Sequence, residues 1–145
     1  MSDSYRYIEE IATADVAFEA KGATMEELFV AAADATMNVM VADLATIDLV
    51  ASRTLEVEDD AVDMLLFQLL QELIYYKDAE LLLLRVSEVH IRHENGLYKL
   101  TAEARGEELN PEKHDLVVDV KAVTLHRYRV EETTEGWEAL VILDI

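Results

Sequence analysis

The sequence contains no cysteine, one proline and four glycines among its 145 residues. The absence of cysteine excludes disulfides, thiolate nucleophiles and cysteine-ligated zinc. The few Gly and Pro residues stand where turns are expected, so no flexible linker divides the chain. Apolar runs such as 81–84 are far too short to span a bilayer, and residues 1–5 lack the features of a signal peptide. We therefore expect a single domain over residues 1–145, located in the cytoplasm and not in a membrane.

Positive charge is also scarce. The chain has 12 Lys and Arg against 31 Asp and Glu, which gives a formal net charge of −19. Tight direct binding to nucleic acid is not expected, because such binding depends on cationic contacts with phosphates. A bound cation or a basic protein partner is easier to accommodate. Solubility alone is the alternative explanation for the acidic surface.

The common catalytic motifs are missing. The chain has no G-x-S-x-G, H-E-x-x-H, P-loop or G-x-G-x-x-G sequence. Of the four histidines, His90, His93 and His126 fall within expected strands, where a surface role is more common than a catalytic one. Any chemistry would therefore have to depend on carboxylates.

The remaining patterns predict two helices and several strands. Thr24-Met25-Glu26-Glu27 has the form of a capping box, which opens a helix that runs to about residue 42. A second helix, capped by Asp59 or Asp60, carries an apolar stripe from Val62 to Ile74 at helical spacing. Strands are expected at 5–10, 15–21, 53–58, 81–93 (with a bulge near Val86), 97–105, 117–131 and 137–144. This order predicts an α+β domain in which two helices pack on one face of a mostly antiparallel sheet.

Two carboxylates at the ends of strands form the one constellation of chemical interest. Asp15 begins an early strand and Asp144 ends the last one, so an antiparallel pairing would place both at the same edge of the sheet. Ile145 would add a main-chain or terminal oxygen there. Such an all-oxygen cluster suits Ca²⁺, Mg²⁺ or Mn²⁺. The alternative is that Asp15 is a turn residue and Asp144 a frayed end.

Several segments resemble the archease family in order and spacing. They include Thr13-Ala14-Asp15 before a strand that ends in Gly22, and the apolar run from Leu65 to Tyr75. The stretches Gly106-Glu107, Asn110 to His114, Val120-Lys121-Ala122-Val123-Thr124 and the ending Leu143-Asp144-Ile145 match as well. The resemblance covers essentially the whole chain.

The resemblance implies a function. Archeases are non-catalytic partners of the GTP-dependent RNA ligase that joins tRNA halves. They promote its guanylylation and its multiple turnover, and they relax its nucleotide requirement. Two other functions stay open for this chain. One is a general chaperone without ligase specificity, and the other is a metal-dependent hydrolase that uses Asp15 and Asp144.

The resemblance also implies a site. A divalent cation, Ca²⁺ with Mg²⁺ or Mn²⁺ as alternatives, would be held by Asp15, Asp144 and Ile145. Ala12 stands where the family usually has a histidine, which removes a group able to orient the ligands. Lys121 and His114 lie in matched motifs and are candidates for partner binding. The alternatives are a surface ion pair for Lys121 and a loop-capping role for His114.

Overall fold

The computed structural model describes residues 4–8 and 15–145. Within them the chain forms seven strands and two α-helices, with longer connections over residues 41–50 and 109–121. In chain order these are β1 (Tyr5–Ile8), β2 (Asp15–Gly22), α1 (Met25–Met40), a short 3₁₀ turn (Leu44–Thr46), β3 (Ala51–Asp59), α2 (Val62–Glu80), β4 (Leu82–Glu94), β5 (Leu97–Glu108), β6 (Ala122–Thr133) and β7 (Gly136–Asp144).

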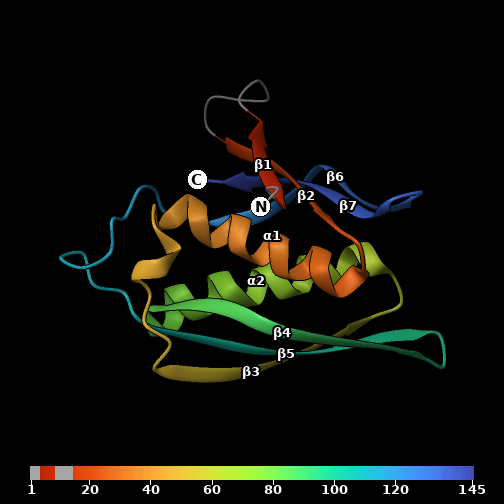
Figure 1. The fold of residues 1–145 in the computed structure, drawn as a ribbon, viewed down its shortest axis with the longest axis horizontal. Coiled ribbons are helices and arrows are strands. Elements are labelled where there is room, and N and C mark those ends of the chain that lie inside the picture. Colours follow the sequence, from red (N-terminus) through yellow and green to blue (C-terminus); the bar gives the residue numbers. More distant parts are fainter. Residues whose placement is uncertain (1–3, 9–14) are drawn as a thin grey trace.

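The strands form two antiparallel sheets with both helices between them (Figure 1). The four-stranded sheet has the order β1-β2-β7-β6, and the three-stranded sheet has the order β3-β5-β4. Helix α1 packs against β2 and β7 on one side and β4 on the other, and α2 contacts strands of both sheets. The predicted α+β class, the two helices and the antiparallel pairing are confirmed. The single sheet that was expected is in fact two, so the helices are covered on both sides.

The sequence of α1 explains why it can lie between two sheets. The consecutive residues Ala31, Ala32 and Ala33 are all buried. Successive helical residues point about 100° apart, so three buried neighbours mean that the helix is enclosed from several directions. Small side chains let the two sheets approach it closely. Helix α2 buries the predicted stripe, including Leu65, Leu69 and Leu73.

The two helix starts differ from each other. The Thr24 hydroxyl accepts from the Glu27 backbone N–H, and Glu27 accepts from the Ala23 N–H, which confirms the predicted capping box. Helix α2 instead has Ala61 at its N-cap, without a capping side chain. Asp59 accepts from the Ala61 N–H, but neither Asp59 nor Asp60 occupies the N-cap position, so the predicted N-cap residue is wrong.

Two strands show departures from regular pairing. The expected bulge of β4 is confirmed by a register shift between Val86 and Glu88. Strand β6 begins at Ala122, not at residue 117, because Ala122 already pairs with Asp144, where β7 ends. Among residues 4–8 and 15–145, segment 117–121 therefore has no strand to pair with, and it runs across the helix ends. Within the residues that the model describes, neither helix is long and apolar enough to cross a membrane.

Candidate metal site

Asp15 and Asp144 are directly opposed in the structure. Strands β2 and β7 pair antiparallel, and Asp15 is the register partner of Asp144. Their neighbours Val16 and Leu143 pack into the core, so strand alternation places both aspartates on the outer face of the four-stranded sheet. Both are half-buried. Opposed residues have Cβ atoms about 4.5–5.5 Å apart, and opposed like charges are destabilising.

A second opposed carboxylate pair in the same sheet has a cationic side chain beside it. Glu131 of β6 lies opposite Glu138 of β7. Arg129 lies within reach of both, with its Nε 3.4 Å from Glu131 and its Nη2 4.0 Å from Glu138. No such ion pair reaches Asp15 or Asp144 from the residues that the structure describes. Among the described residues, the sheet thus supplies a protein cation to the Glu131–Glu138 pair and none to the Asp15–Asp144 pair.

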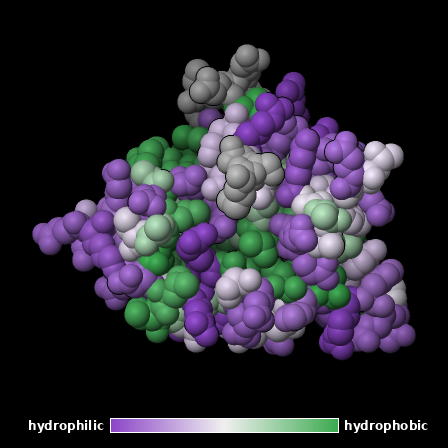
Figure 2. Space-filling model, viewed as in Figure 1, coloured by the Kyte–Doolittle hydropathy of each residue, from purple (hydrophilic) through white to green (hydrophobic). Residues whose placement is uncertain are grey.

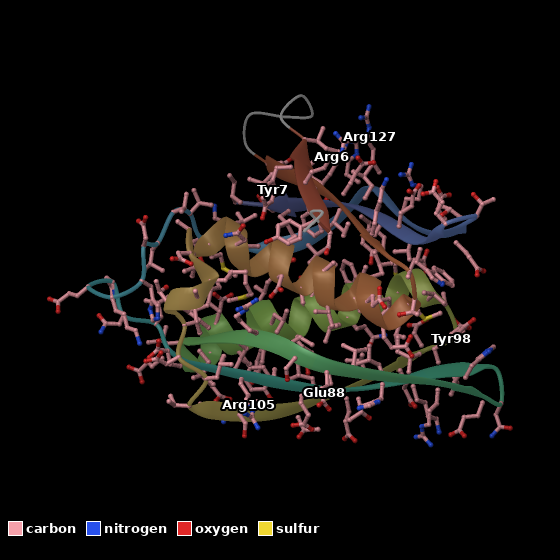
Figure 3. The ribbon with its side chains drawn as sticks, viewed as in Figure 1. Arg6, Tyr7, Glu88, Tyr98, Arg105 and Arg127 are labelled. Carbon is pink, nitrogen blue, oxygen red and sulfur yellow. The ribbon has the colours of Figure 1, made fainter. Side chains whose placement is uncertain are left out.

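Opposed carboxylates also occur on the three-stranded sheet. Glu88 of β4 (Figure 3) lies opposite Glu103 of β5. The side chain of Glu88 is 66% exposed, so water screens its charge, and Thr54 donates to Glu103. The half-buried aspartates of the four-stranded sheet lack this degree of hydration. Asp15 and Asp144 are therefore an opposed carboxylate pair with neither this exposure nor a cationic side chain from the described residues.

The surroundings of the aspartates come from the adjacent chain segments. The Lys121 N–H donates to the Asp144 carbonyl oxygen at 2.8 Å, which fixes the start of β6 beside the site. Ile145 follows directly, half-buried and packed against the core. Lys121 is exposed. Ala12, the predicted departure from the family pattern, lies outside the described residues.

The donor set fits a hard cation with few protein ligands. Within residues 4–8 and 15–145, no cluster of three or more His, Asp and Glu side chains is present, so side chains would supply two carboxylates. Oxygens of Ile145 and water would complete the shell, as is usual for Mg²⁺ and frequent for Ca²⁺. A bound cation would offset the charge of the two aspartates and hold their strands in register.

His114 lies in a second polar network, away from solvent. Its side chain is 0% exposed. The ring Nδ1 accepts from the Asn110 N–H at 3.0 Å, so Nε2 donates to Glu107 Oε2 at 2.9 Å. Glu107 also binds Lys113 Nζ at 2.7 Å and accepts from the Asp48 N–H at 2.8 Å. These contacts fit the capping role considered for His114, which ties the start of the 109–121 loop to the end of β5.

The Glu107 network makes stability depend on pH. The hydrogen bond from Lys113, followed by those from the Asp48 N–H and His114, lowers the pKa of Glu107 from 4.5 to about 2. A carboxyl with a lowered pKa in the folded state stabilises the fold above pH 4.5, and this contribution is lost as the pH falls toward 2.

We therefore expect Glu107→Gln to lower the free energy of unfolding at neutral pH and to flatten its decline below pH 4.5. Urea unfolding at a series of pH values from 7 to 2.5 measures both effects. Glu112→Gln, at an exposed position of the same loop, is the control. Equal pH profiles for Glu107→Gln and the unchanged protein would refute the assignment.

Lys77 is a buried cation that the sequence analysis did not single out. Its Nζ donates to the Val120 carbonyl at 2.9 Å and pairs with Asp119 and with Asp78. Burial lowers its pKa, but the bonds to Asp119 and Asp78 outweigh burial and raise it overall. Lys77 follows Leu73 by four residues, which places it on the apolar face of α2. This spacing is the sequence feature that could have identified Lys77 as buried. Lys77 joins α2 to the segment that leads into the Asp144 site.

The fold and the site together define a class: a small acidic α+β domain with a helix layer between two antiparallel sheets and an opposed aspartate pair at the end of one sheet. The model of the Archease protein family (MTH1598/TM1083) matches residues 5–145. The chain belongs to the archease family.

Known relatives span nearly its whole length. Protein archease of Pyrococcus abyssi is 38% identical over 134 residues, which are 92% of this chain and 94% of that protein. Protein archease of Methanosarcina barkeri is 35% identical over 142 residues, which are 97% of this chain and 95% of that protein.

Two solved structures are similar as well. The solution structure of Methanobacterium thermoautotrophicum protein 1598 has a TM-score of 0.86 at 32% identity and covers 99% of this chain and 100% of that one. The crystal structure of an archease from Thermotoga maritima, described as a possible chaperone, has a TM-score of 0.56 at 18% identity and covers 95% of this chain and 97% of that one. The second similarity supports the fold alone.

Proposed function

We propose that this protein is a non-catalytic activator of the GTP-dependent tRNA-splicing RNA ligase, and that it acts in the cytoplasm. The observation that carries the proposal is membership of the archease family over residues 5–145. The net charge of −19 agrees with it, because an RNA-binding ligase needs cationic surface and an acidic partner is attracted to such a surface. The protein itself need not hold RNA.

The proposal includes a divalent cation, with Ca²⁺ as the first candidate, held by Asp15, Asp144 and oxygens of Ile145. The opposed and half-buried aspartates, which lack a counter-ion among the described residues, support it. The cation would supply positive charge at the surface where the ligase docks. The protein residues hold the two strands and orient the carboxylates, and Lys121 lies next to them as a candidate contact for the partner.

An RNA-ligase turnover assay tests this function. With ligase limiting and tRNA halves in excess, we expect product to stop after a single turnover without this protein and to continue when it is added. Guanylylation of the ligase should become faster in the same mixtures. A product yield that stays at one turnover in the presence of this protein would refute the proposal.

A general chaperone is the second candidate, because the chain belongs to the archease family and one member of that family, from Thermotoga maritima, is described as a possible chaperone. This function predicts that the protein suppresses aggregation of unrelated clients at stoichiometric ratio. Light scattering of two unrelated unfolding proteins measures it. Stimulation of the ligase without any effect on those clients would reject the chaperone.

A further inference from the structure

An apolar patch covers the end of the molecule where both helices finish. We call it the helix-end patch, and it consists of Leu81, Leu109, Leu116, Val117 and Val118. Val117 is 58% exposed and Leu81 is 52% exposed, and Leu116 and Val118 are partly open. Leu109 and residues 116–118 line a hollow of about 230 Å³, and Lys77 also lines it. Figure 2 shows hydrophobic surface at this end, beside the hydrophilic loop that projects from it.

The helix-end patch is held in place from several sides. The Val117 N–H donates to Met40 at the end of α1, and the Leu109 N–H donates to Leu81 at the end of α2. Leu116 forms a bridge with Val41, and Lys77 fixes Asp119. An ordered surface loses little conformational entropy when a partner binds. The patch is therefore ready for a partner without rearrangement.

Leu81 is an unexpected residue for its position. It has φ 55° in the left-handed region at the C-cap of α2, where glycine is the usual residue. A leucine here bears the strain of a side chain in this conformation and also exposes apolar surface. An outlier of this kind points to a role in binding.

The charges around the patch define its occupant. Asp115 and Asp119 flank residues 116–118 in the chain, Asp78 and Glu80 lie in the last turn of α2, and Glu108 precedes Leu109; all five are exposed. Asp78 and Asp119 share Lys77, and Glu80 pairs with Arg53, so negative charge is still in excess around the patch. With a net charge of −19, a second copy of this chain, an anionic membrane and RNA are all repelled. We infer that the helix-end patch docks a basic protein segment whose apolar side chains enter the hollow.

This inference rests on the proposed function, because the tRNA ligase is then the protein that carries this segment. The geometry relates the patch to the aspartate site. Residues 116–121 run without interruption from the patch to Lys121, whose N–H binds the Asp144 carbonyl. A partner seated on the helix-end patch would thus have Asp15 and Asp144 beside it.

Val117→Asp tests the docking surface, and Leu125→Asp is its matched control. Both side chains are 58% exposed, but Leu125 lies on β6, outside the patch. Titration of purified ligase, followed by calorimetry, should show at least about tenfold weaker binding for Val117→Asp and a change of less than about twofold for Leu125→Asp. Thermal unfolding of each variant checks that both are folded.

Leu81→Gly supplies a test in which the stability of the fold and the affinity for the ligase are expected to change in opposite directions. We expect a higher melting temperature, because glycine removes the backbone strain, together with weaker binding to the ligase. A purely structural role for Leu81 would leave the affinity unchanged. This variant keeps the test decisive even if Val117→Asp proves unstable.

The outcomes separate the two proposals. If the unchanged protein neither binds nor stimulates the ligase, the proposed function fails and the docking proposal fails with it. If the unchanged protein binds and Val117→Asp binds equally well, only the docking proposal is overturned. Sedimentation would show whether the unchanged protein forms a concentration-dependent dimer. If it does and Val117→Asp abolishes the dimer, the patch binds a second copy of the chain, and the docking proposal is overturned as well.

Discussion

Ca²⁺ is expected to stabilise this protein against heat, and Asp144→Asn is expected to abolish that effect. At a free Ca²⁺ concentration 100 times the dissociation constant, binding to the folded state adds about 2.7 kcal/mol. For a domain of this size that corresponds to a rise of about 5–10 °C in melting temperature. Without divalent cations the variant should be more stable than the unchanged protein by up to about 1 kcal/mol, because one of two opposed like charges is gone.

Thermal unfolding in EDTA and in a series of Ca²⁺, Mg²⁺ and Mn²⁺ concentrations measures both the stabilisation by the cation and the higher stability of Asp144→Asn without it. Glu138→Gln is the matched control, since it removes one of two opposed carboxylates from β7 at a place where Arg129 already supplies a cation. It should leave the Ca²⁺ response intact. If Ca²⁺ still raises the melting temperature of Asp144→Asn, or does not raise that of the unchanged protein, the proposed cation site is refuted.

The same variant should separate activation from docking. Asp144→Asn leaves the helix-end patch unaltered, so we expect it to bind the ligase and yet fail to sustain multiple turnover. Val117→Asp should fail already at binding. Asp15→Asn should repeat the behaviour of Asp144→Asn, because the proposal assigns both aspartates to the same cation.

Loss of the Lys77 ammonium is expected to produce the largest change in stability. The side chain is 5% exposed, and its Nζ binds the buried Val120 carbonyl as well as Asp119 and Asp78. Lys77→Met keeps the apolar stem and removes the charge, which leaves the Val120 carbonyl without this donor. Both aspartates are exposed and can be hydrated, so we expect a cost of about 2–3 kcal/mol, below the range for a fully buried pair.

Urea unfolding measures the loss of stability for Lys77→Met. Hydrogen exchange adds a local readout, because amides of residues 115–121 should lose protection before those of the sheets. Asp78→Asn is the control and should cost less than about 1 kcal/mol, since it removes an exposed member of the pair. Uniform loss of protection over the whole chain would show that Lys77 does not act specifically on this segment.

The sequence predicted those features that depend on local pattern. The apolar stripe of α2, the capping box at Thr24 and the bulge near Val86 are confirmed, because each is set by residues close together in the chain. The meeting of Asp15 and Asp144 depended on one antiparallel pairing, which the structure contains. Binding of a cation there remains a prediction.

The features that were missed depend on distant partners. The division into two sheets follows from how α1 is enclosed, and the consecutive alanines 31–33 were the signal for it. Residues 117–121 alternate like a strand but pair with no strand in the part of the chain that the structure describes, because β7 ends opposite Ala122. In the network of His114, the hydrogen bond from the Asp48 N–H to Glu107 joins residues 59 positions apart, and no local pattern predicts it.

The pairing of β2 with β7 has a consequence for biosynthesis. These strands are neighbours in the four-stranded sheet, yet both helices and the three-stranded sheet lie between them in the chain. Contacts between segments so far apart form late and slow the folding of a domain. While the chain is still being synthesised, β2 must wait for β7, although α1, α2 and β3–β5 can already associate. A nascent or truncated chain without β7 lacks Asp144 and therefore the opposed aspartate pair, so under the proposed function we expect it not to activate a ligase.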